Sequence, residues 1–181
     1  TLILLLALLW VLIQTSPVQN WLVAQVTGKL SSDLHSHISI KNVEFSFFNK
    51  MVLQGVLMKD QKGDTLVSSG EVRLNITDWF FFKDKIELKY IGMDETYIRL
   101  SRTDSVWNYK FLADYFAGDS TEKKKPIELQ LGQIQITHLH LLKADGWRGE
   151  DMELRMTAFS MDADSLDIAR KKAIIKSLYF T

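Results

Sequence analysis

The sequence predicts a mainly β protein, in which N-terminal helices lead into a curved antiparallel sheet that carries one or two short further helices. Three features of the chain lead to this prediction. The chain opens with an apolar run, the next segment has apolar residues at helical spacing, and from His37 onward apolar and polar residues alternate. Alternation with a period of two is typical of half-buried strands, whereas a period near 3.6 is typical of amphipathic helices.

The composition fits a folded domain and excludes several classes of function. With 181 residues, 46% of them hydrophobic, the chain can bury a core. Its 22 basic residues equal its 22 acidic residues, so we expect no nucleic-acid partner. The sequence contains no cysteine, which excludes disulfides and thiolate metal sites.

An uninterrupted apolar run extends from Leu2 to Ile13. At about 12 residues it is shorter than the roughly 20 that span a bilayer, so it is either a signal-peptide core or part of a transmembrane helix that starts before Thr1. The polar segment 14–17 lacks the small-residue pattern of a cleavage site. We therefore expect a transmembrane anchor over residues 1–16 of a longer protein. Its anchoring residues would be Leu4, Leu8, Trp10 and Ile13.

Residues 17–34 have the pattern of an amphipathic helix. Pro17 suits the first helical turn, and apolar residues follow at helical spacing: Val18, Trp21, Leu22, Val26 and Leu30. Such a helix either caps the end of a sheet or lies at a membrane surface. We favour the capping helix.

Residues 35–116 are predicted to form the first strands of the sheet. Apolar residues alternate through segments near Ile38, Phe45, Leu53, Leu74, Leu88 and Leu100, with a bulge at Lys41-Asn42. The segment 61–64 has hairpin-turn composition. Four consecutive aromatic residues, 79–82, are expected to pack against the capping helix or the sheet end rather than dip into a membrane. A short helix opening near Asn108 is expected to cover a sheet end.

Residues 117–126 have the composition of a mobile basic surface loop, and residues 127–181 return to strand alternation. In this second part, the apolar positions change between odd and even numbers around Gly132 and again around Thr137-His138. Such a phase change marks a bulge, and bulges curve a sheet.

No recognised catalytic motif occurs in the chain, and we expect neither an enzyme nor a cofactor. The pairs His35/His37 and His138/His140 have the i, i+2 spacing of two zinc ligands on one strand face, but no third ligand is evident. We interpret them as solvent-facing polar pairs. Asp162, Asp164 and Asp167 lack the glycine and glutamate of a calcium loop.

The order of these parts resembles the N-terminal region of the TamB/AsmA-like family. The resemblance is carried by an apolar anchor, a helix and four segments: Val43-Glu44-Phe45-Ser46-Phe47-Phe48, then residues 55–66 (GVLMKDQKGDTL), 78–86 (DWFFFKDKI) and 102–109 (RTDSVWNY). It implies a single-pass protein of the Gram-negative inner membrane, whose strands curl into a taco-shaped groove in the periplasm. The family is associated with outer-membrane biogenesis through bridge-like phospholipid transport. An older view assigns it to outer-membrane protein assembly or secretion with TamA, through regions outside this chain.

The strand pattern agrees with a lipid groove, because few helices are available to cover the apolar face of the sheet. We expect the groove to be lined by Ile38, Ile40, Phe45, Leu53, Leu74, Leu88, Leu100, Leu129 and Ile136. Phospholipids and the inner membrane would then be its partners. Two alternatives remain: a closed β-sandwich with a dry core, and a scaffold that offers strand edges to client proteins.

Overall fold

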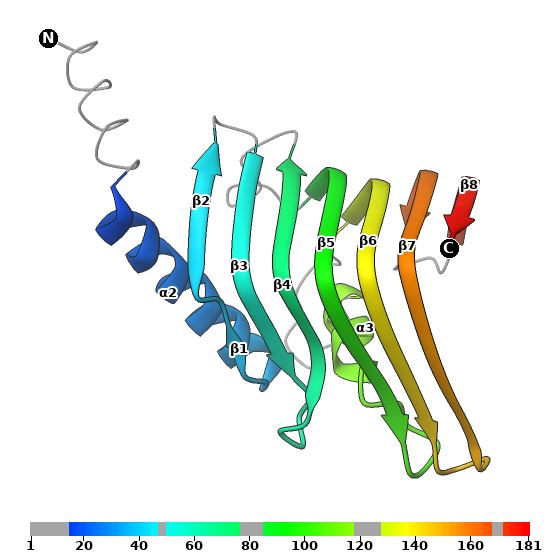
Figure 1. Ribbon diagram of the computed structural model, residues 1–181. Coiled ribbons are helices and arrows are strands. Elements are labelled where there is room, and N and C mark those ends of the chain that lie inside the picture. Colours follow the sequence, from blue (N-terminus) through cyan, green and yellow to red (C-terminus); the bar gives the residue numbers. More distant parts are fainter. Residues whose placement is uncertain (1–14, 47–49, 77–84, 118–127, 168–171) are drawn as a thin grey trace, which may run out of the picture.

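The computed structural model describes residues 15–46, 50–76, 85–117, 128–167 and 172–181. Its strands form an eight-stranded, mostly antiparallel mixed sheet with a long helix at one end (Figure 1). The prediction of a mainly β fold behind an N-terminal helix is thereby confirmed. The predicted anchoring residues, the aromatic segment 79–82 and the loop residues 118–126 lie outside the described residues. Neither helix in the described part of the chain has the length and apolar character needed to cross a bilayer.

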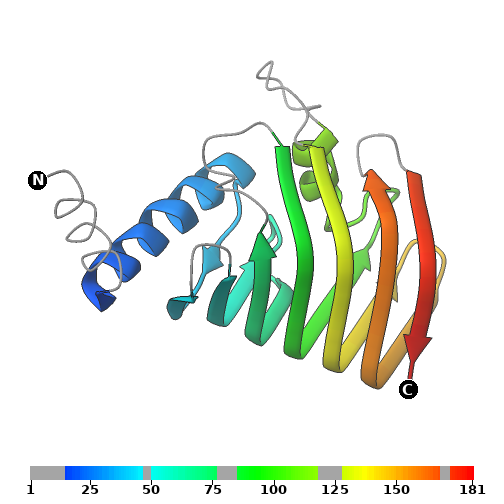
Figure 2. The ribbon, with the colours of Figure 1, turned by 90° about the horizontal axis from the view of Figure 1, so that it is seen from above.

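The helix α2, Ser16–Leu34, is the one predicted over residues 17–34. Pro17 stands in its first turn, and its C-cap His35 adopts the left-handed conformation with φ 48°. The helix lies beside β1 (Ile38–Ser39) and β2 (Asn42–Ser46), at one end of the sheet (Figures 1 and 2). The hydroxyl of Ser31 accepts a hydrogen bond from the Ile38 backbone at 3.0 Å. This end of the sheet is therefore covered by α2, although Trp21 remains 60% exposed.

The remaining strands are longer than the sequence pattern predicted. They are β3 (Lys50–Lys59), β4 (Thr65–Ile76), β5 (Lys85–Arg102), β6 (Glu128–Asp145), β7 (Glu150–Asp167) and β8 (Lys172–Phe180). In the sheet they follow the order β1-β3-β4-β5-β6-β7-β8, and β2 also pairs with β3. The separate short strands predicted around Leu88 and Leu100 are one strand, because a bulge changes the phase of the side chains without ending the strand.

The prediction of a wholly antiparallel sheet is wrong at one pair. Strands β5 and β6 run parallel, whereas the other neighbours run antiparallel. After β5 ends at Arg102, the chain passes through the helix α3, Lys110–Ala117, before β6 begins. A parallel pair requires such a crossover. The short helix near Asn108 was expected only as a cover, but it belongs to this connection.

A backbone irregularity occurs at matching positions in three strands of the sheet. Gly55 in β3, Glu95 in β5 and His138 in β6 all have positive φ, at 60°, 48° and 49°. The pairing of β5 with β6 passes from Met93↔Ile136 to Thr96↔Leu139, so both strands change phase together. The apolar residues therefore stay on one face along the whole length of the strands. The change of phase predicted at Thr137-His138 is thereby confirmed, but the register stays in step, so the irregularity is shared by both strands and is not a bulge in one of them.

A second interruption of the β5–β6 pairing lies at Gly132, where the second bulge was predicted. The pairs on either side are Leu88↔Leu131 and Tyr90↔Gln133. A Cβ atom at Gly132 would come within 2.7 Å of the Lys89 carbonyl oxygen. Glycine is required here because two backbones approach closely.

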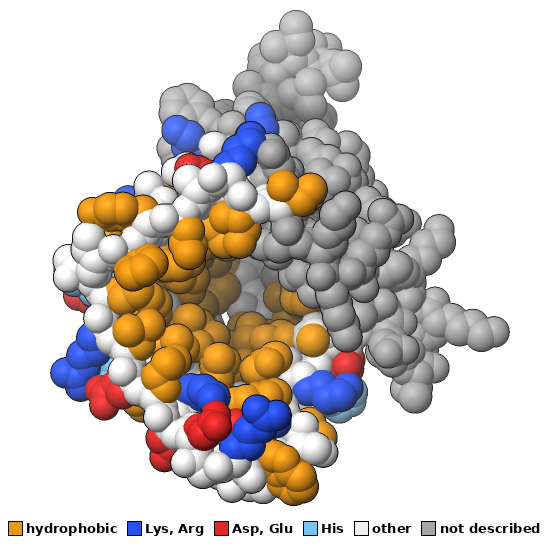
Figure 3. Space-filling model, turned by 90° about the vertical axis from the view of Figure 1, so that its right-hand side faces the viewer, with side chains coloured by type: hydrophobic (Ala, Val, Ile, Leu, Met, Phe, Trp, Pro, Cys, Tyr) orange, Lys and Arg blue, Asp and Glu red, His pale blue; other side chains and the backbone are white. Residues whose placement is uncertain are grey.

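The long strands bend near their middle, so that the sheet is curved (Figures 1 and 2). Helix α3 lies on the side toward which they bend. Seen from the β8 end, hydrophobic side chains line a hollow on this side of the sheet (Figure 3). We call this side the concave face.

Candidate functional site

The concave face carries continuous cross-strand rows of apolar side chains. Residues paired directly across strands share a face of the sheet, so the register defines each row. One row consists of Leu53, Val72, Met93, Ile136, Phe159 and Phe180. A second row consists of Met51, Leu74, Ile91, Ile134, Met161 and Leu178. Both rows run without a polar residue from β3 to β8.

Many side chains on this face are incompletely buried, although Met51, Val72, Ile136 and Met161 of the two rows are buried. Those that stay half-buried are Leu53, Leu74, Ile91, Met93, Ile98, Leu100, Ile134, Leu141 and Phe159. Toward β8 they become exposed, reaching 53% at Leu178 and 64% at Phe180, whereas Leu66 elsewhere is only 1% exposed. The described strands form a single sheet, and no second sheet among them packs on the concave face. The expected alternative of a closed sandwich therefore does not describe this part of the chain.

Three of the nine predicted lining residues occupy positions in these two rows. Leu53, Leu74 and Ile136 belong to the two rows above, while Ile38 pairs with Met58 and Leu100 pairs with Lys143. The backbone register places Leu88 opposite Leu131, Phe45 opposite Met51 and Leu129 opposite Ile86. The side chains of Phe45 and Leu129 are outside the described part. Ile40 lies between β1 and β2 and belongs to no row.

Two polar residues lie within the apolar face, Ser69 and its neighbour Thr96, which are 3% and 1% exposed. Ser69 Oγ lies 2.8 Å from the Asp94 carbonyl oxygen and 3.2 Å from Thr96 Oγ1. These hydroxyls find their partners inside the sheet, at the irregularity. They therefore stabilise the bend and leave the concave face chemically apolar.

The opposite face holds one of the predicted histidine pairs. Asp94 accepts hydrogen bonds from Thr137 Oγ1 and from His138 Nδ1, the latter at 2.8 Å. These bonds, first that from Thr137 and then that from His138, lower the pKa of Asp94 from 3.8 to about 2. His140 Nε2 lies 2.9 Å from a Glu153 oxygen.

Each of these histidines thus has its own carboxylate partner, and the two do not converge on one point. His35 ends α2, so the other predicted pair does not share a strand. Asp162 in β7 accepts a hydrogen bond from Ser177 Oγ at 3.0 Å. Within the described ranges, no group of His, Asp and Glu side chains is placed to hold a metal ion.

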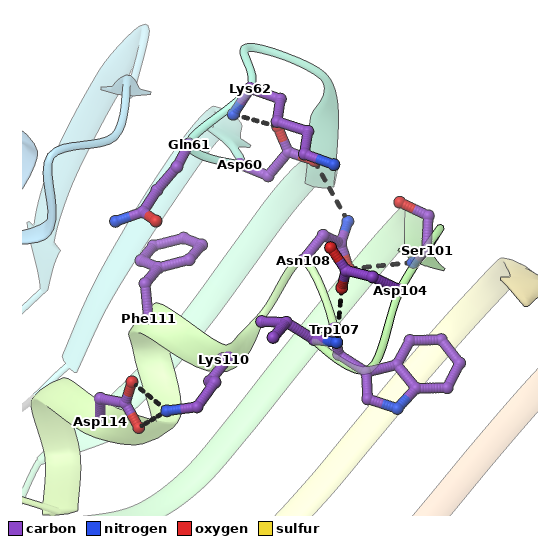
Figure 4. A pocket seen from close by; sticks show the side chains of 11 residues that line it. Asp60, Gln61, Lys62, Ser101, Asp104, Trp107, Asn108, Lys110, Phe111 and Asp114 are labelled. Carbon is purple, nitrogen blue, oxygen red and sulfur yellow. Dashed lines mark hydrogen bonds and ion pairs between the residues drawn. The ribbon is translucent and has the colours of Figure 1, made fainter. Parts of the chain in front are cut away.

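A pocket of about 290 Å³ lies where the β3–β4 turn meets the start of the crossover (Figure 4). Asp60 is 3% exposed, and its carboxylate accepts the Lys62 and Asp64 backbone N–H groups at 2.9 Å each. Asn108 donates to the same carboxylate at 3.3 Å. Lys110 pairs with Asp114 at 2.6 Å. These charged groups are satisfied within the protein, so the pocket is a structural junction that holds the crossover against the turn.

A set of charged residues follows the apolar part of the concave face at one end of strands β5, β6 and β7. Arg102 pairs with Asp145, Asp145 pairs with Glu150, and Lys143 stands two residues before Asp145 on the same face. We call Arg102, Lys143, Asp145 and Glu150 the polar lip. Charged side chains gather at one margin of the hollow in Figure 3.

Within the polar lip, the Arg102 guanidinium bonds both Asp145 oxygens, at 2.6 and 2.7 Å, and stacks 4.6 Å from the Trp107 ring centroid. The hydrogen bond from Arg102 lowers the pKa of Asp145, and the same bond raises the pKa of Arg102.

The sequence pattern did not predict the polar lip, although one of its residues interrupts the alternation of apolar and polar residues. Lys143 continues the odd-numbered alternation of Leu139 and Leu141, so it falls at a position where the pattern calls for an apolar residue. The partnership of Arg102 and Asp145 has no such signal, because it depends on the parallel pairing of β5 and β6.

No protein-family model matches the chain, and no curated protein matches it. The resemblance to the TamB/AsmA-like family therefore stays a prediction from the quoted segments. The function has to be argued from the concave face.

Proposed function

We propose that this chain is the membrane-proximal part of a periplasmic groove protein anchored in the Gram-negative inner membrane. In this proposal the concave face is a β-taco groove that holds phospholipid acyl chains, and the protein contributes to outer-membrane biogenesis by bridge-like lipid transport. It binds and guides lipid without catalysing a reaction. The proposal depends most on one observation, the unbroken apolar rows from β3 to β8, in which most side chains are half-buried or exposed.

The energetics of acyl-chain burial support this function. Each CH₂ group removed from water contributes about 0.8 kcal/mol, so partial burial of two acyl chains stabilises a complex by many kcal/mol. The hydrophobic effect has no directional requirement. A chain lying across the rows is therefore held but can move along them, because neighbouring rows present the same chemistry.

A photo-crosslinking experiment tests the proposal. A photo-reactive amino acid is placed at Leu74 or Ile136 on the concave face, and at the adjacent positions Arg73 or Gln135, which point to the opposite face. We expect phospholipid adducts at Leu74 and Ile136 and none at the two controls. Absence of lipid adducts at both concave positions would contradict the proposal.

A second candidate function is a scaffold for outer-membrane protein assembly, together with a TamA-like partner. It is favoured by the exposed apolar residues on β8, where Tyr179 is 61% and Phe180 is 64% exposed. A client strand pairing along such a strand would be held by backbone hydrogen bonds. Adducts to protein alone at Leu74 and Ile136 would support the scaffold over the lipid groove.

A further inference from the structure

We propose that the polar lip binds the headgroup of a phosphoethanolamine lipid, with the phosphate at Lys143 and the ammonium at Glu150. This inference rests on the proposed function, because it assumes that the acyl chains lie on the concave face. It adds a headgroup site and a class of lipid to that function.

The register places Lys143 near the end of β6, just beyond the apolar side chains of the concave face. It pairs with Leu100 on one side and with Met152 on the other, and it lies two residues from Leu141. Its aliphatic stem therefore shares a face with the apolar side chains, while its ammonium reaches the margin of the hollow. An amphiphile with its chains on the rows would bring its headgroup to this margin.

Of the two cations in the polar lip, Lys143 is the one whose N–H donors make no short hydrogen bond to a carboxylate. Its Nζ lies 3.5 Å from a Glu150 oxygen and 4.0 Å from an Asp145 oxygen, both longer than a charge-assisted hydrogen bond of about 2.8 Å. Arg102 is 12% exposed and is held by two short bonds to Asp145. A phosphate can thus approach Lys143 without breaking a strong contact, whereas it would have to displace Asp145 from Arg102.

Glu150 determines which kind of headgroup fits. Its side chain is 62% exposed and stands beside Lys143. A carboxylate next to the phosphate site attracts an ammonium and repels a second negative charge. The pair of opposite charges therefore matches a zwitterionic phosphoethanolamine better than a purely anionic headgroup.

The test measures lipid binding to the full 181-residue chain in detergent micelles by native mass spectrometry. The probes are dioleoyl phosphatidylethanolamine, dioleoyl phosphatidylglycerol and dioleoylglycerol, which share their acyl chains. We expect the wild-type chain to bind phosphatidylethanolamine about tenfold more tightly than dioleoylglycerol, and Lys143→Gln to bring this ratio close to one. Lys89→Gln, which removes a charge at an exposed position of β5, should leave the ratio unchanged.

A companion variant tests the ammonium contact. Glu150→Gln should abolish the preference for phosphatidylethanolamine over phosphatidylglycerol while keeping the preference of both over dioleoylglycerol. Circular dichroism of each variant verifies that the sheet is intact.

The outcomes separate the two proposals. If Lys143→Gln keeps the tenfold ratio, or if Lys89→Gln loses it equally, the headgroup site is overturned while acyl-chain binding stands. If Glu150→Gln keeps its preference for phosphatidylethanolamine, the ammonium contact is overturned. If the wild-type chain binds none of the three lipids, the proposed function itself fails.

Discussion

Two carboxylates, Asp94 and Asp145, show how single side chains hold the long strands together. Asp94 in β5 receives donors from Thr137 and His138 of β6 at the irregularity. Asp145, at the end of β6, receives the Arg102 guanidinium from the end of β5. Both therefore join the parallel pair, one near its middle and one at its end.

The low pKa of Asp94 predicts a defined pH dependence of stability. Its folded-state pKa, about 2, lies below the ordinary aspartate pKa of 3.8, so its stabilising contribution is complete above about pH 4 and is lost as the pH falls through about 2. The stability difference between wild type and Asp94→Asn, measured by urea unfolding, should thus be largest near neutral pH and vanish toward about pH 2.

Thr137→Val serves as the comparison for Asp94, because it removes the hydroxyl that lowers the pKa most. It should reduce the same acid-dependent contribution while leaving the carboxylate in place. An Asp94→Asn curve parallel to wild type down to about pH 2 would contradict the assignment.

Asp145→Asn should destabilise the protein more than the substitution of an exposed ion pair. Asp145 is 1% exposed, so losing its charge leaves the Arg102 guanidinium poorly compensated in a mostly buried site. We expect a fall of about 5 °C or more in melting temperature by circular dichroism. Asp64→Asn, in an exposed pair with Arg99, should change it by about 1 to 2 °C at most. Equal shifts would show that the Arg102 pair has no special role.

At the scale of elements, the irregularity lets long strands bend without losing an apolar face. A strand that simply curved would keep its period of two, and a bulge in one strand alone would turn its side chains to the wrong side. Here Gly55, Glu95 and His138 adopt positive φ in separate strands of the same sheet. The coordinated phase change therefore preserves both the pairing and the concave face.

Gly55→Ala should test this element directly. A Cβ atom at Gly55 would lie 2.7 Å from Lys41 Cγ, and φ of 60° is unfavourable for alanine, so we expect a loss of about 1 to 2 kcal/mol in unfolding free energy. The control Gly28→Ala lies within α2, where an added methyl group meets no atom within 4 Å, and should stabilise by about 0.5 to 1 kcal/mol. Chemical denaturation gives both values, and a neutral Gly55→Ala would argue against a strained bend.

At the scale of the whole molecule, the protein keeps part of its apolar surface outside a closed core. Leu66 is 1% exposed, whereas eight of the twelve residues in the two rows of the concave face are half-buried or exposed. A sheet of this kind supplies stability through its fully buried residues and leaves the concave face available for an apolar ligand.

Because of this difference in burial, a leucine-to-alanine substitution should lower the unfolding free energy by different amounts at the two kinds of position. Leu66→Ala should lower the unfolding free energy by about 2 to 5 kcal/mol, the range for a fully buried leucine. Leu141→Ala, at a half-buried position, should cost less than half as much, because its side chain already has fewer protein contacts to lose. Urea denaturation of both variants provides the comparison. Similar losses would indicate that the concave face is a packed interior.

The sequence by itself determined the features that depend on local periodicity. These are the helix after Pro17, the change to strands near His37 and the change of phase at Thr137-His138. Each of these is decided by residues close together in the chain, because alternation tells which side chains share a face of one strand.

Only the tertiary structure decided the parallel pairing of β5 with β6, the joining of short segments into long strands and the polar lip. The alternation of apolar and polar residues is the same in parallel and antiparallel strands. The sequence pattern therefore could not show that Arg102 pairs with Asp145 and donates a hydrogen bond to it. Strand partners are chosen by contacts between distant residues and by the path of the crossover, and these enter the free energy only when the whole sheet assembles.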